Sequence, residues 1–245
     1  EGLVFRAGYS SGYRAPQAYE HDLHLAAVGG AVSLISLDPN LRPEYSHSAT
    51  LSADWYKQFG KWEVNLTAEG FYTYLQDVFF LREDGLDASG NVLFTRTNAP
   101  GAWVGGLNIE GKVSFSHWFT FQLGYTYQQS RYTVAQQWSA DVAPQTRMLH
   151  TPDNYGYMLL DIYPVKDFTI SVNGKATGSM IVPHLAGYIP KDEETLAPSF
   201  WDLGIRLAYD VHLYKHYCLE ISAGVKNILD QFQRDIDKGE YRDAS

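Results

Sequence analysis

The sequence has little positive charge, one cysteine and no long apolar run. It carries 19 Lys and Arg against 28 Asp and Glu in 245 residues, a formal net charge of -9, so it lacks the basic surface that nucleic-acid binding needs. Cys218 cannot form an internal disulfide. Because no run of about 18 apolar residues occurs, no transmembrane helix is expected. A membrane is not excluded, since a transmembrane β-strand needs only about 9 to 11 alternating residues.

Strict alternation between apolar and polar residues is the strongest pattern that is present. It organises the stretch from Glu44 to Tyr74, with a tight turn at residues 57–61. In the first half, the odd positions from Tyr45 to Trp55 are apolar, aromatic or His, and the even positions are polar. Since side chains on a strand point alternately to opposite faces, this stretch predicts a long hairpin with one apolar and one wet face.

The same alternation predicts nine strands along the chain. Their ranges are 3–9, 44–57, 62–80, 103–115, 119–128, 155–163, 168–177, 201–211 and 219–225. The segments 11–43, 82–90, 130–154 and 179–198 read as loops. The orientation of 155–163 stays open, because Tyr157 and Leu159 on one face are apolar, as are Met158, Leu160 and Ile162 on the other.

Long and short connections alternate through the whole chain. This is typical of an antiparallel up-and-down barrel in an outer membrane, with short periplasmic turns and long outer loops. The tryptophans are placed near both ends of the predicted strands. Trp55, Trp62 and Trp118 lie beside short turns, and Trp103 and Trp201 lie at the long-loop ends, as in the two aromatic girdles at the interfaces of a membrane barrel. We therefore expect an all-β transmembrane barrel.

The predicted polar face carries charged residues at the middle of its strands, from Glu63 and Lys112 to Lys175 and Arg206. Such groups must meet water or polar partners, which favours a wide or plugged lumen. Bacterial single-chain barrels have an even number of strands, and an open sheet would leave unpaired edges in lipid. Nine strands therefore predict a partial barrel.

Five segments resemble signatures of TonB-dependent outer-membrane receptors, in the family's order. They are Phe5–Pro16, Asp38–Glu44, Thr97–Ala99 with Gly106–Glu110, Ala176–His184 and Gly224–Asp230. The resemblance implies a 22-stranded barrel with an N-terminal plug, located in the Gram-negative outer membrane among its lipids. It also implies a small-molecule or metal-chelate ligand (a metal-siderophore, haem, corrinoid or glycan) that is imported with energy from the TonB complex. The resemblance implies no enzymatic activity and no bound cofactor.

This sequence departs from the complete pattern of that family at both ends. No plug, no TonB box, no first half of the barrel and no aromatic-ended closing strand are recognisable, and the chain begins at Glu1 rather than Met. We therefore expect residues 1–245 to be the C-terminal portion of a receptor barrel, whose contact with the TonB complex would run through the missing plug. A passive porin or substrate-specific channel, an outer-membrane enzyme and a soluble β-rich binding module remain alternatives.

Candidate ligand-binding residues lie on the predicted outer loops. They are Arg14, His21, Asp22, His24, Tyr132, His150 and His184. Imidazoles and carboxylates as close as those of 20–24 suit a transition metal or metal chelate, but their spacing matches no tight structural site, so no resident metal is expected. Tyr-rich loops suit flat or ring-bearing ligands. No Ser, His or Asp arrangement predicts a catalytic group.

Overall fold

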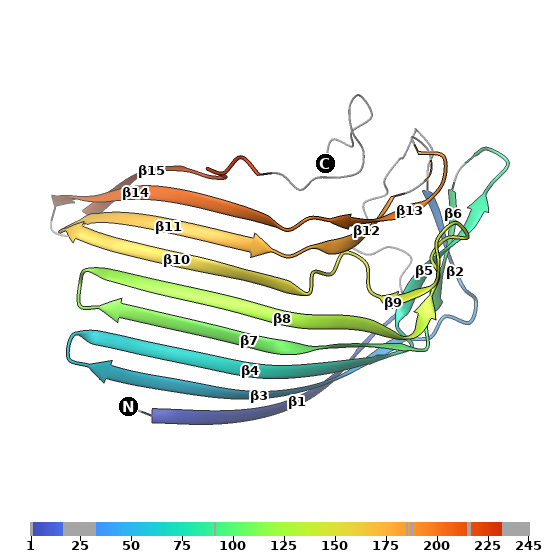
Figure 1. Cartoon of the computed structure of the whole chain (residues 1–245), viewed down its shortest axis with the longest axis horizontal. Coiled ribbons are helices and arrows are strands. Elements are labelled where there is room, and N and C mark those ends of the chain that lie inside the picture. The colour runs from blue at the N-terminus through green and yellow to red at the C-terminus, as the bar shows by residue number, and fades with distance from the viewer. Residues whose placement is uncertain are drawn as a thin grey trace.

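The computed structural model describes residues 2–16, 33–90, 92–184, 186, 189–214 and 217–231. Nine long antiparallel strands lie side by side in one curved sheet (Figure 1). They are β1 (Gly2–Arg14), β3 (Glu44–Phe59), β4 (Trp62–Gln76), β7 (Gly101–Phe115), β8 (Phe119–Gln136), β10 (Asn154–Val165), β11 (Phe168–Thr177), β14 (Phe200–Tyr214) and β15 (Tyr217–Val225). Among these described residues, no helix is long and apolar enough to cross a membrane.

Each long strand pairs with its neighbour in the order β1-β3-β4-β7-β8-β10-β11-β14-β15, and β9 (Gln145–Arg147) adds a tenth, short strand on β8. The predicted hairpin is confirmed, with Tyr45 opposite Gln76 and Phe59 opposite Trp62. The nine predicted strands and their up-and-down order are therefore correct. Their ends are not, because β8 continues eight residues beyond the predicted end at Gln128.

Register settles the orientation of β10, which the sequence left open. Met158 lies opposite Gly174 and Leu160 opposite Val172, so both share the apolar face. Tyr157 lies opposite Lys175 on the polar face, where its hydroxyl donates to Glu110 Oε2 at 2.6 Å. This hydrogen bond explains why an aromatic residue is accommodated among charged ones, because it satisfies the polar end of the ring.

Aromatic residues gather near both ends of the apolar face. At the short-turn end, Trp62 lies 4.5 Å from Phe115 and 5.9 Å from Phe119 between ring centroids. At the long-loop end, Trp103 stacks on Tyr72 at 6.0 Å. Phe115 and Trp103 are twelve positions apart on β7, or about 41 Å of strand at about 3.4 Å a residue.

A tilt of about 35 to 45° would reduce that length to about 29 to 33 Å across a membrane. The hydrocarbon core of a bilayer is about 30 Å thick. The spacing of the two aromatic rows therefore matches the two interfaces of a bilayer, as the positions of the tryptophans predicted.

The segments predicted as loops contain further strands, which corrects that part of the sequence interpretation. β2 (Ser33–Leu37) pairs in parallel with β6 (Val92–Asn98), and β6 pairs with β5 (Phe79–Leu86). β12 (Met180–His184) and β13 (Glu193–Ala197) form a separate two-stranded sheet. The predicted continuation of β4 to Phe80 is also wrong, because Asp77 takes a positive φ of 53° and ends the strand there.

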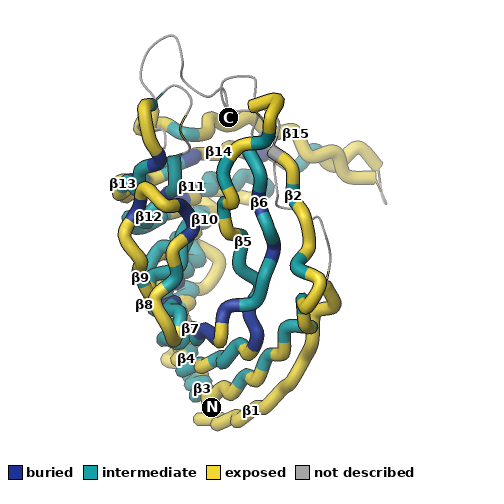
Figure 2. Tube along the Cα trace, turned by 90° about the vertical axis from the view of Figure 1, so that its right-hand side faces the viewer, coloured by how far each residue is buried: buried dark blue, intermediate teal, exposed yellow. Residues whose placement is uncertain are grey.

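The three-stranded sheet lies on the hollow side of the main sheet at its long-loop end (Figure 2). The junction contains a buried cluster of Val78, Ala99 and Ala102, against which Tyr132 and Phe80 pack. Ala102 and Tyr132 are register partners and belong to the polar face by alternation. The polar face is therefore the concave one, and the apolar face with its aromatic rows is convex.

Candidate functional site

A hydrogen-bonded joint holds the three-stranded sheet over the hollow face. Asn98 donates from Nδ2 to the backbone oxygens of Asp77 (2.6 Å) and Arg42 (3.0 Å), and its Oδ1 accepts from the Arg42 N–H at 2.8 Å. Arg42 also forms an ion pair with the buried carboxylate of Asp77 at 2.6 Å. One amide thus joins three separate chain segments.

Arg14, a predicted ligand residue, lies at the end of β1 beside this joint. Its Nη2 lies 3.2 Å from Glu44 Oε2, and its guanidinium lies 4.7 Å over the Phe79 ring. The same Glu44 oxygen accepts from the Phe79 N–H at 2.9 Å. Arg14 therefore helps to fix the start of β5 on the main sheet, and its side chain also keeps an exposed part at the mouth.

Tyr132 serves mainly in packing. Its ring meets Phe80 edge to face at 5.8 Å and lies against the buried cluster of Val78, Ala99 and Ala102. Edge-to-face pairs of this kind stabilise a junction beyond the area they bury. Arg14 and Tyr132 thus contact two adjacent residues at the start of β5, Phe79 and Phe80 respectively.

The His150 segment and β12, the strand that ends at His184, meet at another corner of the same end. His150 is exposed, takes a positive φ of 54° and donates its backbone N–H to the Ile181 oxygen at 2.8 Å. His184 ends the β12 strand that contains Ile181, opposite Glu193 in register. The remaining predicted residues, His21, Asp22 and His24, lie outside the described residues.

Sequence reasoning missed a group that we call the acidic junction: Glu83, Asp141 and Asp192 with Trp138 and Ser139. Glu83 donates its backbone N–H to the Trp138 oxygen at 2.9 Å, and Asp192 donates its own to Asp141 Oδ2 at 3.2 Å. Trp138 Nε1 donates to Glu194 Oε1 at 2.8 Å. The junction therefore ties β5, the β8–β9 connection and the β12–β13 hairpin to one another.

One carboxyl of the acidic junction, that of Glu83, has a raised pKa. Burial, followed by the hydrogen bond and negative charge of Asp192, raises the pKa of Glu83 from 4.5 to about 7. Burial also acts to raise the pKa of Asp192, but hydrogen bonds from Glu83, Ser139 and the Ala186 N–H outweigh it and lower that pKa. Glu83 thus donates and Asp192 accepts, as expected for two close carboxyls that share one proton.

No signal in the sequence marks the acidic junction, because its carboxyls come from three distant segments. In the described ranges, no group of three or more His, Cys, Asp or Glu side chains is arranged to hold a metal ion. Polar and aromatic side chains surround the long-loop end of the hollow polar face. The hydrogen bonds of Asn98 hold the three-stranded sheet in place there.

The comparisons with known proteins agree with this architecture. A family model described as TonB dependent receptor-like, beta-barrel matches residues 1–228, whereas no curated protein sequence matches. The siderophore receptor PirA from Acinetobacter baumannii shares the fold with a TM-score of 0.64 at 15% identity, over 94% of this chain and 35% of its own.

Two further solved structures give the same result. The FrpB iron transporter from Neisseria meningitidis has a TM-score of 0.61 at 11% identity, over 94% of this chain and 33% of its own. The copper transporter OprC has a TM-score of 0.63 at 14% identity, over 95% of this chain and 32% of its own. The chain thus spans about a third of the length of these structures, and at such identities the likeness concerns the fold.

Proposed function

Because this chain belongs to the TonB-dependent receptor β-barrel family, we propose that it is the C-terminal portion of the barrel of an outer-membrane receptor. The whole receptor binds a scarce ligand at the surface of a Gram-negative cell and imports it with energy from the TonB complex. In this proposal the plug and the first half of the barrel belong to the rest of the parent protein, and the plug makes the contact with TonB.

The observation that carries this proposal is the hollow polar face, whose additional small sheets, among the described residues, lie at the long-loop end. The inner face bears charged side chains that water or a plug can satisfy, such as Glu110, which accepts from Tyr157 and Gln122 at 2.6 and 2.9 Å. The outer loops contain two small sheets, whereas the connection from Phe59 to Trp62 is a two-residue turn. This asymmetry suits recognition outside the cell and passage through the lumen.

The proposed ligand is a metal-siderophore, haem, corrinoid or glycan. The relatives named above are an iron transporter, a copper transporter and a siderophore receptor, which favours a metal or metal chelate within that group. Among the described residues, His150 and His184 suit such a ligand, since imidazole binds transition metals and aromatic rings alike. Arg14 and the residues His21, Asp22 and His24 complete the proposed contact set.

Uptake by the full-length parent receptor tests the proposal. A deletion strain would carry the parent gene and be supplied with a ferric siderophore, haemin, cobalamin or an oligosaccharide, with and without a working TonB. We expect uptake of one of these ligands that requires TonB. A passive channel, the alternative, would take up its substrate equally in cells that lack TonB.

Paired histidine variants separate ligand contact from general damage. His150→Ala with His184→Ala should lower uptake at limiting ligand concentration, because both side chains lie at the outer end. His117→Ala is the matched control, since His117 occupies the short turn 116–118 at the opposite rim. Equal loss in both variants, or loss in neither, would remove these two histidines from the contact set.

A further inference from the structure

Two arginines face outward at the long-loop end of the barrel wall. Arg131 on β8 lies directly opposite Trp103 on β7, and Trp103 belongs to the apolar, convex face. Arg147 on β9 lies opposite Arg131, so it is on the same face. Neither guanidinium therefore points toward the hollow side where the proposed ligand would enter.

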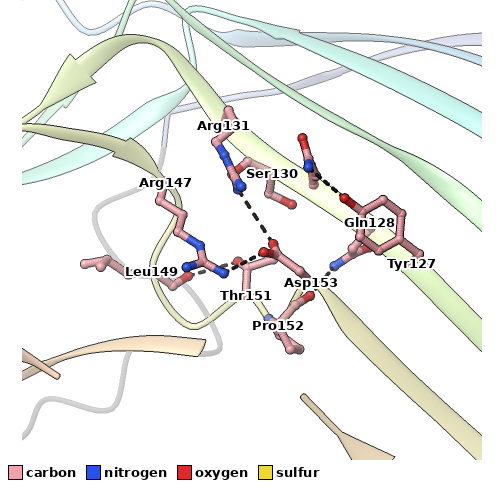
Figure 3. A network of polar contacts seen from close by, with 10 residues as sticks. Tyr127, Gln128, Ser130, Arg131, Arg147, Leu149, Thr151, Pro152 and Asp153 are labelled. Carbon is pink, nitrogen blue, oxygen red and sulfur yellow. Dashed lines mark hydrogen bonds and ion pairs between the residues drawn. The ribbon is translucent and has the colours of Figure 1, made fainter. Parts of the chain in front are cut away.

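The two arginines share a single carboxylate (Figure 3). Asp153 Oδ2 lies 2.5 Å from Arg147 Nη2, and its Oδ1 lies 3.6 Å from Arg131 Nη1. Two positive charges and one negative charge leave this group with a net charge of +1. The side chains of Arg131, Arg147 and Asp153 stay 23%, 30% and 21% exposed, so the excess charge is within reach of a ligand at the surface.

Two hydrogen-bond donors beside this group are unused. Gln145 Nε2 and Arg147 Nε are buried, and neither has an acceptor within hydrogen-bonding distance in the structure described. Gln145 and Arg147 are two positions apart on β9, so they lie on the same face of that strand. Buried donors without acceptors are rare and costly; because both atoms are covered, a ligand at the surface meets the exposed parts of the Arg131 and Arg147 side chains instead.

The height of this group on the barrel wall bears on the nature of its ligand. Trp103 stacks on Tyr72 in the outer aromatic row, and such rows lie at the level of the lipid headgroups. Arg131 is at the same height as Trp103 because the two are register partners. We propose that Arg131 and Arg147 bind a phosphate group of an outer-leaflet lipid, with Asp153 bridging the two guanidinium groups.

Phosphate fits these donors better than other headgroup chemistry. Arginine presents a planar fork of donors that matches phosphate oxygens, and the net charge of +1 on the group of Arg131, Arg147 and Asp153 favours an anion. This proposal rests on the outer-membrane location of the barrel but not on the identity of the imported ligand, so uptake and lipid binding can fail independently.

The test uses the full-length parent receptor, delipidated in detergent and titrated with bisphosphorylated lipid A while native mass spectrometry counts the bound lipids. Arg131→Gln with Arg147→Gln should weaken binding by about fivefold for each arginine, on the basis of about 1 kcal/mol per basic residue near a lipid surface. Arg82→Gln is the matched control, because Arg82 also forms an ion pair, at 3.0 Å with Asp84, but lies on β5 over the hollow side.

A second variant distinguishes a lipid site from a structural clamp. Asp153→Asn raises the net charge of the group from +1 to +2 and should tighten lipid binding by several-fold. A clamp that only fastens β9 to β10 would show no such gain. If the double variant does not fold, the single variant Arg131→Gln takes its place. Equal binding of phosphate-free lipid A, equal affinity for inorganic phosphate, or unchanged binding in the arginine variants would overturn the proposal.

Discussion

Ionisation of Glu83 should loosen the contact between β5 and the β12–β13 hairpin as the pH rises. The carboxyl group of Glu83 faces Asp192 from the hairpin side, and Ser139 and Asp141 from the β8–β9 connection. Protonated Glu83 can donate to Asp192. Ionised Glu83 places a second negative charge beside the carboxylates of Asp192 and Asp141, so the attraction becomes repulsion.

The raised pKa of Glu83 makes closure more stable at low pH. A carboxyl whose pKa is 4.5 in the opened segment and about 7 in the closed one stabilises closure fully below pH 4.5, and this contribution is lost as the pH rises to about 7. The full difference corresponds to about 3.4 kcal/mol. Glu83 is only half-buried, and water screens its charge, so the expected change in the free energy of opening is about 1 kcal/mol. This corresponds to a change of about fivefold in the opening equilibrium.

Hydrogen exchange of the β12–β13 amides, measured on the full-length receptor in detergent between pH 5 and 8, is the assay. Glu83→Gln keeps a donor for Asp192 but cannot ionise, so its protection should stay constant after correction for the intrinsic exchange rate. Wild-type protection should fall about fivefold across this interval. Asp84→Asn, at the next position of β5, is the control. Identical pH profiles for wild type and Glu83→Gln would refute the reasoning.

Three other predictions concern packing, the acidic junction and solubility. Gly106→Ala should destabilise the barrel by about 3 kcal/mol through overpacking, because the new methyl group would press on the Tyr127 carbonyl and lie 2.9 Å from Gln128 Cα. Gly70→Ala is the control, because a methyl group at that position meets nothing within 4 Å. Thermal unfolding in detergent compares the stability of the two variants. Trp138→Phe removes the Nε1 donor to Glu194 and should speed proteolysis of the β12–β13 hairpin, while Trp118→Phe at the opposite rim should not. The 245-residue chain alone should need detergent, because its convex face exposes residues such as Phe5, Leu51 and Trp201; a monodisperse protein in plain buffer, measured by light scattering, would contradict this.

Local alternation was sufficient to predict the wall of the barrel. Side chains of a strand alternate with a period of two whatever the strand packs against, so stretches such as Glu44–Tyr74 reveal both the strands and their two faces. Short turns follow from the same pattern, since an antiparallel neighbour needs only a few residues to return. The order of the nine strands and the aromatic rows could therefore be read from the sequence.

The outer end could not be predicted in this way. The Arg82–Gly90 and Ser130–Asn154 segments read as loops, yet the first includes most of β5 and the second contains β9 and the extension of β8 that carries Arg131. β2 pairs with β6 although almost sixty residues separate them, and such non-local pairing leaves no periodic trace. His150 and His184 were found as residue types, but the backbone hydrogen bond that ties the His150 segment to β12 was not.

The sequence by itself determined which residues share a face, because that depends only on the geometry of an extended backbone. The tertiary structure decided which face is hollow, through the packing of Tyr132 and Phe80 between two sheets. It also placed Glu83 beside Asp192, and Arg131 beside Arg147 and Asp153. Those groups arise from contacts between distant segments, and their charges act through space rather than along the chain.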